Sequence, residues 1–167
     1  MIFIKFVNLI LILVICSYIG IIKSKSYENR VVELNKFQNS LVMFKSKIEF
    51  TYEPLKNIFQ DISKVIYKNE KNIFEEAIKS DEEIYISWSN AIDNFKGSFN
   101  VEDREIIKMF GKLLGKTDIK GQVNEICLTQ NLIEKQIEKA EIEKAKNVKL
   151  YKSMGIILGI GICIILV

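Results

Sequence analysis

The sequence predicts an all-α protein, a six-helix antiparallel bundle flanked by an N-terminal transmembrane helix and a short C-terminal one. Three observations predict it. The 167 residues are 49% hydrophobic, but two long uncharged runs, residues 6–22 and 153–167, stand at the two ends. Between them, apolar residues recur at three- and four-residue spacing, which is typical of amphipathic helices. The alternation that marks strands is almost absent there, and Pro54 is the only proline.

The expected organisation is therefore an N-terminal anchor at residues 1–23, a helical domain at 24–152 and a membrane segment at 153–167. The first uncharged run has 17 residues. As a helix it spans about 26 Å, close to the apolar thickness of a bilayer, about 30 Å. A cleaved signal peptide is the alternative, because Lys5 supplies a basic start. The run is long and no small-x-small cleavage site follows it, which favours a retained anchor.

The second uncharged run has 15 residues and reaches only about 22 Å as a helix. To cross, it must thin the bilayer or include Leu150 and Tyr151; otherwise it dips into the membrane without crossing. Gly155 and Gly159 are spaced as in helices that approach each other closely in membranes. Glycine is also simply frequent in membrane helices, so both interpretations stay open.

Lysine and arginine flank both runs on the side of the middle segment, which predicts that this segment is cytoplasmic. These residues are Lys23, Lys25, Arg30, Lys144, Lys146, Lys149 and Lys152, against Lys5 alone on the other side. A reducing compartment fits the three cysteines, Cys16, Cys127 and Cys163, which show no disulfide framework.

Composition excludes several function classes. The chain has no histidine, which removes the commonest general base and the commonest metal ligand. Its net charge is +3, and the middle segment alone is nearly neutral. A basic nucleic-acid binder is not indicated. We expect no enzymatic activity, no cofactor, no metal, no nucleic acid and no small-molecule substrate.

Five helices are expected before the long last one. The first covers residues 27–50, the second begins with Pro54 in its first turn, and a short third covers residues 72–79. Ser80 and Glu83 form a capping-box pattern that starts a fourth helix. That helix carries Trp88 in the core and stops at Gly97.

Asn100 is the expected cap of a fifth helix over residues 101–114, which ends at Gly115. Asp118 opens a very long sixth helix that no breaker separates from the second apolar run. Gly111, Gly115, Lys116 and Thr117 imitate a phosphate-binding loop. The glycine spacing is one residue short, and the segment leaves a helix rather than a strand, so nucleotide binding is not expected.

Two charged groups are candidate partner-binding surfaces. A basic ridge along the fifth helix recurs every four residues, and we expect it to bind an acidic partner or lipid headgroups. The ridge consists of Arg104, Lys108, Lys112 and Lys116, with Lys120 following. A solvated helix face is the alternative.

The second group is acidic and surrounds the connection between the third and fourth helices: Glu75, Glu76, Asp81, Glu82 and Glu83. Partner recognition is one interpretation. The alternative is stabilisation of helix N-termini through the macrodipole. Exposed carboxylates have nothing to shift their pKa values, so acid–base catalysis is not expected.

The order of these features resembles the stage III sporulation protein AB family of endospore-forming bacteria, over essentially the whole chain. The blocks that carry the resemblance are Ile48-Glu49-x-x-Tyr52-x-Pro54-Leu55, the Trp88 helix, Phe110-Gly111-x-x-Leu114-Gly115-x-x-Asp118, Gln122, Ile126 and Leu128, and Lys146-Asn147-x-Lys149-Leu150-Tyr151-Lys152-Ser153-Met154-Gly155. Thr117 stands where the family has a serine before the aspartate. The motif residues that we expect to be structural are Pro54, Trp88, Phe110, Gly111, Gly115, Asp118, Gln122 and Tyr151.

The resemblance implies a role in the channel or secretion-like assembly that joins mother cell and forespore. Its helical domain is similar to the cytoplasmic domains of the inner-membrane platform proteins of type II secretion and type IV pilus machines. By that likeness the protein is a platform in the outer forespore membrane, facing the mother-cell cytoplasm. Its partners are other membrane subunits, lipid and the cytoplasmic ATPase, stage III sporulation protein AA. A membrane-anchored adaptor or signalling protein is the alternative.

Overall fold

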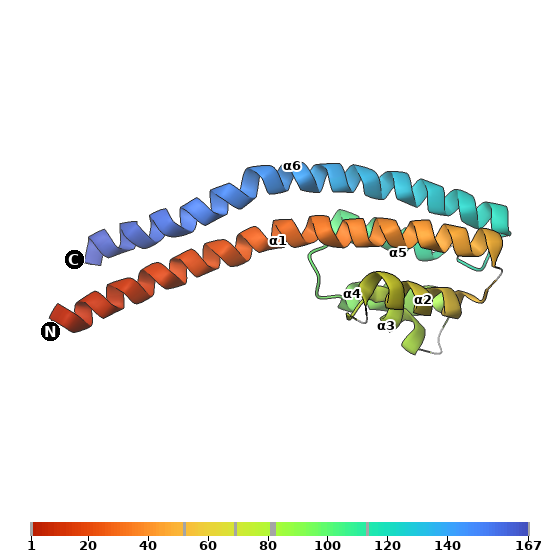
Figure 1. Ribbon diagram of the computed structural model, residues 1–167, viewed down its shortest axis with the longest axis horizontal. Coiled ribbons are helices and arrows are strands. Elements are labelled where there is room, and N and C mark those ends of the chain that lie inside the picture. Colours follow the sequence, from red (N-terminus) through yellow and green to blue (C-terminus); the bar gives the residue numbers. More distant parts are fainter. Residues whose placement is uncertain (1, 52, 69, 81–82, 113, 167) are drawn as a thin grey trace. The chain divides into compact units, whose positions relative to one another are not determined.

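Six helices and no strand make up the part of the chain that the structure describes. The computed structural model describes residues 2–51, 53–68, 70–80, 83–112 and 114–166, with side chains between residues 7 and 165. The helices are α1 (Ile2–Phe50), α2 (Leu55–Tyr67), α3 (Ile73–Lys79), α4 (Ile84–Asn94), α5 (Val101–Lys112) and α6 (Ile119–Leu166) (Figure 1). The predicted all-α fold class, with long apolar helices at both ends, is confirmed.

The chain divides into two compact units, and α1 and α6 contribute to both. The terminal unit comprises Met1–Val31 and Lys139–Val167, and the central unit comprises Val32–Glu138. Residues 24–31 and 139–152, which the sequence led us to assign to the helical domain, belong to the terminal unit.

The core of the central unit is a cluster of aromatic side chains, all with 0% exposure. They are Phe37, Phe44, Phe59, Phe74, Trp88 and Phe110. Neighbouring ring centroids lie 5.2–6.5 Å apart. Aromatic pairs at such distances add about 0.5–1.5 kcal/mol each beyond the burial of their area. The cluster therefore joins α1, α2, α3, α4 and α5 into one packed unit.

The part of α1 in the central unit supplies one side of this core. Its buried apolar residues follow three- and four-residue steps, which keep them on one face of a helix. They are Leu34, Phe37, Leu41, Phe44 and Ile48. The predicted apolar stripe is confirmed.

Two helices begin at the predicted caps, Asn100 and Asp118, and α3 begins at a cap, Asn72, that we expected to be the first residue of the helix. The side chain of Asn72 accepts a hydrogen bond from the Glu75 N–H at 3.0 Å, and that of Asp118 accepts one from the Gly121 N–H at 2.9 Å. Asn100 accepts from the Asp103 N–H at 2.7 Å, while the Asp103 carboxylate accepts from the Asn100 N–H at 3.0 Å. These bonds satisfy backbone donors that a helix N-terminus otherwise leaves unpaired.

The predicted capping box of the fourth helix is wrong. Ser80 has an extended conformation and ends α3, while α4 begins at Ile84, with Glu83 at its N-cap and no capping bond from the Glu83 side chain. Because Ser80 is the C-cap of α3 and the N-cap of α4 is Glu83, Ser80 cannot be the N-cap that a capping box requires. Asp81 and Glu82 lie outside the described residues.

Helix ends also differ slightly from those expected. Pro54 precedes α2 as its N-cap instead of occupying the first turn. α4 stops at Asn94, before Gly97, and α5 stops at Lys112. Gly115 follows with φ +73°, a left-handed conformation that glycine adopts without strain.

α1 continues through residues 23–26, where we expected a separate anchor and first helix. Serine hydroxyls bond back to the helix: Ser24 donates to the Ile21 carbonyl at 2.9 Å and Ser26 to the Lys23 carbonyl at 2.8 Å. No glycine or proline stands there to break the helix. α6 likewise runs without interruption into the second apolar run, as predicted.

Within the terminal unit, the apolar parts of α1 and α6 lie side by side (Figure 1). Their backbones meet at glycines. A Cβ on Gly20 would lie 2.6 Å from the Tyr151 carbonyl oxygen, and one on Gly155 would lie 2.8 Å from the Cys16 carbonyl oxygen. Larger residues at these two positions would push the helices apart.

The other faces of these two segments are apolar and uncovered. In the most apolar window of each helix only 11% of the residues are buried. Exposed side chains include Ile10, Leu11, Val14, Ile19, Ile157, Leu158 and Ile164. Both helices are long and apolar enough to cross a membrane. An exposed apolar surface of this extent is consistent with membrane association.

The contact between Gly111 and Trp88 gives a first prediction. A Cβ on Gly111 would lie 2.8 Å from Trp88 Cγ, and the fully buried indole cannot move away. We expect Gly111→Val to lower the free energy of unfolding by at least about 2 kcal/mol through overpacking. Urea unfolding of the full chain in detergent, followed by circular dichroism, measures this.

Met109→Val places the same side chain on the same helix at a position that is 45% exposed, and it is expected to leave the midpoint almost unchanged. Equal midpoints for the two variants would contradict the packing described for Gly111.

The helix contact in the terminal unit gives a second prediction. A Cβ on Gly159 would lie 3.4 Å from the Cys16 Cβ, close to the separation of about 3.5–4.5 Å found in disulfides. With Cys127 and Cys163 replaced by alanine, G159C is expected to form an intramolecular disulfide with Cys16 on mild oxidation. Mobility on a non-reducing gel reports it.

The matched control is G161C, because a Cβ on Gly161 would meet nothing within 4 Å. Similar disulfide yields for G159C and G161C would show that the two apolar helices do not pack through this face.

Candidate functional site

Only part of the predicted basic ridge lies on α5 and faces α4, because α5 ends at Lys112 and Lys116 lies beyond it. Arg104, the first member, is fully engaged with α4. Arg104 Nη2 donates to the Phe95 carbonyl at 2.7 Å, and Arg104 Nη1 donates to the Ile92 carbonyl. These carbonyls lie at the C-terminal end of α4, where helices leave acceptors unpaired. Arg104 therefore closes the end of α4 and is not open to a partner.

Two lysines of the ridge form ion pairs with α4 and the residue before it. Lys108 Nζ lies 2.5 Å from an Asp93 carboxylate oxygen. Lys116 Nζ lies 2.6 Å from a Glu83 carboxylate oxygen and 5.9 Å from the centre of the Tyr85 ring. Members of the predicted basic and acidic surfaces thus bind each other within the chain.

Lys112 differs from its neighbours on the ridge. It is exposed, and no residue in the described part of the chain forms an ion pair with it. Lys116 is half exposed in an exposed pair, and such pairs are weak enough to be exchanged for an intermolecular one. The end of the ridge at Lys112 and Lys116 is the part that remains available.

The acidic group is also largely compensated. Glu75 and Glu76 both lie near Lys79 Nζ, at 3.4 Å and 2.7 Å. Glu83 pairs with Lys116, and Glu82 lies outside the described residues. The structure does not gather Glu75, Glu76 and Glu83 into one uncompensated acidic surface.

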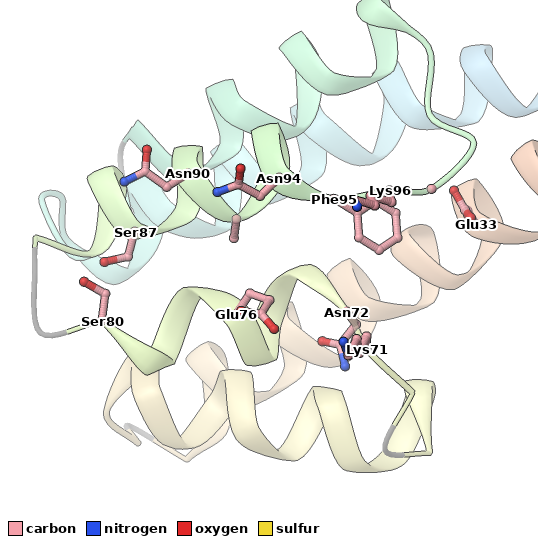
Figure 2. Close-up of a pocket in the computed structure, with 12 residues that line it drawn as sticks. Glu33, Lys71, Asn72, Glu76, Ser80, Ser87, Asn90, Asn94, Phe95 and Lys96 are labelled. Carbon is pink, nitrogen blue, oxygen red and sulfur yellow. The ribbon is translucent and has the colours of Figure 1, made fainter.

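Sequence reasoning missed a polar cleft between α3 and α4. Its volume is about 870 Å³. Figure 2 shows Ser80 and Ser87 at one end and Glu33 of α1 with Lys96 at the other. Ser87, Asn90 and Asn94 lie at helical spacing along α4, beside the apolar stripe of Trp88. That polar stripe was the signal in the sequence that could have predicted the cleft. It was not sufficient by itself, because the polar face of a surface helix is usually only in contact with solvent.

Glu33 is the electrostatically unusual group of the cleft. It accepts a hydrogen bond from the Ser98 N–H at 2.6 Å, yet burial raises the pKa of its carboxyl above the ordinary value. The folded state therefore favours protonation of Glu33. The stabilisation that this proton brings is fully present below the ordinary pKa and is lost as pH rises through the raised pKa.

Three of the motif residues lie in the aromatic core. The rings of Trp88 and Phe110 lie 5.7 Å apart, and the Trp88 indole N–H donates to the Ile107 carbonyl at 2.8 Å. Gly111 leaves room for that indole. These residues position α5 against α4.

Four more motif residues lie at helix ends. Pro54 precedes α2, and a Cβ on Gly115 would lie 3.1 Å from a Leu55 methyl group. Asp118 caps α6, and the Gln122 side chain donates to the Thr117 carbonyl at 3.0 Å. Their roles in this structure are conformational.

The last motif residue, Tyr151, lies in the terminal unit, and its carbonyl oxygen is the atom that Gly20 approaches. Its ring stacks on Tyr27 with centroids 5.7 Å apart. Arg30, only 7% exposed at its side chain, lies 2.8 Å from a Glu143 carboxylate oxygen. Lys152 and Glu28 lie 3.4 Å apart. Stacking and ion pairs thus extend the pairing of α1 and α6 beyond their apolar parts.

No group of three or more cysteine, aspartate or glutamate side chains is placed to hold a metal ion, among the residues with described positions.

Comparisons with known proteins bear on the whole chain. The model of the stage III sporulation protein AB family matches residues 5–167. Stage III sporulation protein AB of Bacillus subtilis (strain 168) is 23% identical over 168 residues, which cover 97% of this chain and 98% of that protein.

A solved structure of a stage III sporulation protein AB has the same fold. It superposes with a TM-score of 0.62 at 20% identity, and the match covers 71% of this chain and 98% of the solved one. Since the family model matches nearly every residue, this protein belongs to the stage III sporulation protein AB family.

Proposed function

We propose that the protein is a non-enzymatic membrane platform of the channel or secretion-like complex that joins mother cell and forespore during endospore formation. Its place is the outer forespore membrane, with the central unit in the mother-cell cytoplasm. There it docks the cytoplasmic ATPase of the complex, stage III sporulation protein AA, and contacts other membrane subunits. Family membership supports the sporulation role.

The observation that carries the platform proposal is the pair of uncovered apolar helices attached to a packed helical unit. Both ends of the central unit continue into apolar segments, in α1 and in α6. A unit that is anchored in the membrane at both ends stays near the membrane subunits of the complex.

Basic residues support the cytoplasmic location of the central unit. Lys23 and Lys25 follow the apolar part of α1, while Lys149 and Lys152 precede that of α6. Lysines near a membrane span are retained on the cytoplasmic side.

The end of the ridge at Lys112 and Lys116 is the proposed docking surface for the ATPase. Lys112 is exposed and has no ion pair with the described residues, so it is already open to an acidic partner. Arg104 and Lys108 instead hold α4 against α5. The surface is thus smaller than the ridge that the sequence suggested.

Membrane orientation is tested by cysteine labelling. In a variant with the three native cysteines replaced by alanine, N131C places a thiol on an exposed position of α6 in the central unit. When this variant is produced in non-sporulating cells, where the cell membrane holds it, a membrane-impermeant maleimide is expected to label it only after the cells are permeabilised. Labelling in intact cells would overturn the cytoplasmic location.

Docking is tested by charge reversal. We expect Lys112→Glu to weaken binding of the purified ATPase to the full chain by about tenfold, because a like charge would then face the acidic partner. Co-purification and heat-resistant spore yield should fall together. Lys64→Glu, an equal charge change at an exposed position on α2, is the matched control.

Variants at Lys108 distinguish a loss of docking from a loss of packing between α5 and α4. Lys108→Glu breaks the pair with Asp93, and adding Asp93→Lys restores a pair of opposite orientation. We expect the double variant to recover ATPase binding.

Unchanged binding by Lys112→Glu would remove this surface from the proposal and leave membrane anchoring standing.

A further inference from the structure

Six lysines lie just beyond the apolar parts of α1 and α6, and all six are exposed. They are Lys23, Lys25, Lys144, Lys146, Lys149 and Lys152. We call them the lysine collar. All belong to the terminal unit, and none forms part of the proposed ATPase surface.

The helix contact brings the two halves of the lysine collar together. Gly20 lies against the Tyr151 carbonyl, so Lys23 and Lys25 are within about two helical turns of Lys152. The pair between Lys152 and Glu28, 3.4 Å apart, crosses from one helix to the other at this level. The lysines of two distant parts of the sequence therefore share one end of the apolar segment.

Most of the collar's charge is uncompensated. Residues 23–31 and 139–152 hold eight lysines and arginines against three glutamates. Glu143 is taken by Arg30, and Glu28 by Lys152. The other five lysines form no ion pair with any residue whose position the structure describes. Like charges crowded in this way repel each other unless an outside anion neutralises them.

Aromatic residues mark the same level as a membrane boundary. Tyr27 and Tyr151 stack beside the collar, and Tyr18 is 62% exposed one to two turns into the apolar part of α1. Tyrosine is enriched where hydrocarbon meets the polar headgroups. The collar then lies at headgroup depth.

The arrangement around α6 distinguishes lipid from a protein partner. At about 100° per residue, positions 144, 146, 149 and 152 spread over roughly 200° of the helix circumference. A docked acidic helix or strand contacts one face only. Headgroups surround a helix pair, and on the remaining part of the circumference Leu150 is 46% exposed and Met154 43% exposed, as suits lipid chains.

We propose that the lysine collar binds the headgroups of anionic phospholipids in the leaflet that faces the central unit. The proposal rests on the membrane insertion of α1 and α6 in the proposed function. Anionic lipid would neutralise the collar and fix the depth of the helix pair. Lys/Arg clusters directly beside membrane spans have this affinity, and salt weakens it.

The test measures the lipid selectivity of the full chain reconstituted in phosphatidylcholine vesicles. Electron spin resonance with spin-labelled phosphatidylglycerol or phosphatidylcholine reports which lipid contacts the protein. We expect about a threefold preference for phosphatidylglycerol that declines at high salt. Replacing Lys144, Lys146 and Lys149 by glutamine should remove most of that preference.

The control replaces Lys64, Lys120 and Lys135, three exposed lysines of the central unit, by glutamine and should keep it. An inserted chain with no preference, or equal preference in both triple variants, would overturn the collar proposal and leave the platform standing. A chain that carbonate washing releases from the vesicles would overturn membrane anchoring, and the collar proposal with it.

Discussion

The packing of Trp88 is the interaction on which the central unit depends. Phe37 of α1, Phe59 of α2, Phe74 of α3 and Phe110 of α5 all bring their rings within 6.5 Å of the indole. Its N–H has a partner in a carbonyl of α5. An aromatic side chain this large fits only because α5 presents a glycine where the helices meet. Short helices that are marginal alone become stable through such shared burial.

Charge in the central unit serves folding first, and only part of it is open to the docking that we propose. Arg104 and Lys108 hold α5 to α4, so most of the basic ridge is satisfied inside the chain. What is left for a partner is the exposed end at Lys112. Reversing every lysine of the ridge together would mix a loss of packing with a loss of docking, and the structure separates the two.

The terminal unit combines two opposite kinds of contact along one helix pair. In the apolar part, glycines let the backbones of α1 and α6 touch. Beyond it, an aromatic stack and the pair of Arg30 with Glu143 continue the contact, while five lysines of the collar remain unpaired. The apolar surface suits hydrocarbon and the lysines suit the layer of charged headgroups next to it, so each lies where its solvation is most favourable.

The sequence by itself determined the all-helical class, the apolar stripe of α1, the caps at Asn100 and Asp118, and the two apolar ends. Each follows from spacing or from one side chain bonding its own backbone, which are local effects. Only the tertiary structure decided that Ser80 ends α3 instead of starting α4, that Arg104 and Lys108 face α4, and that a polar cleft opens beside Ser87. Those depend on which helices meet, and long-range packing is not encoded in the spacing of any single segment.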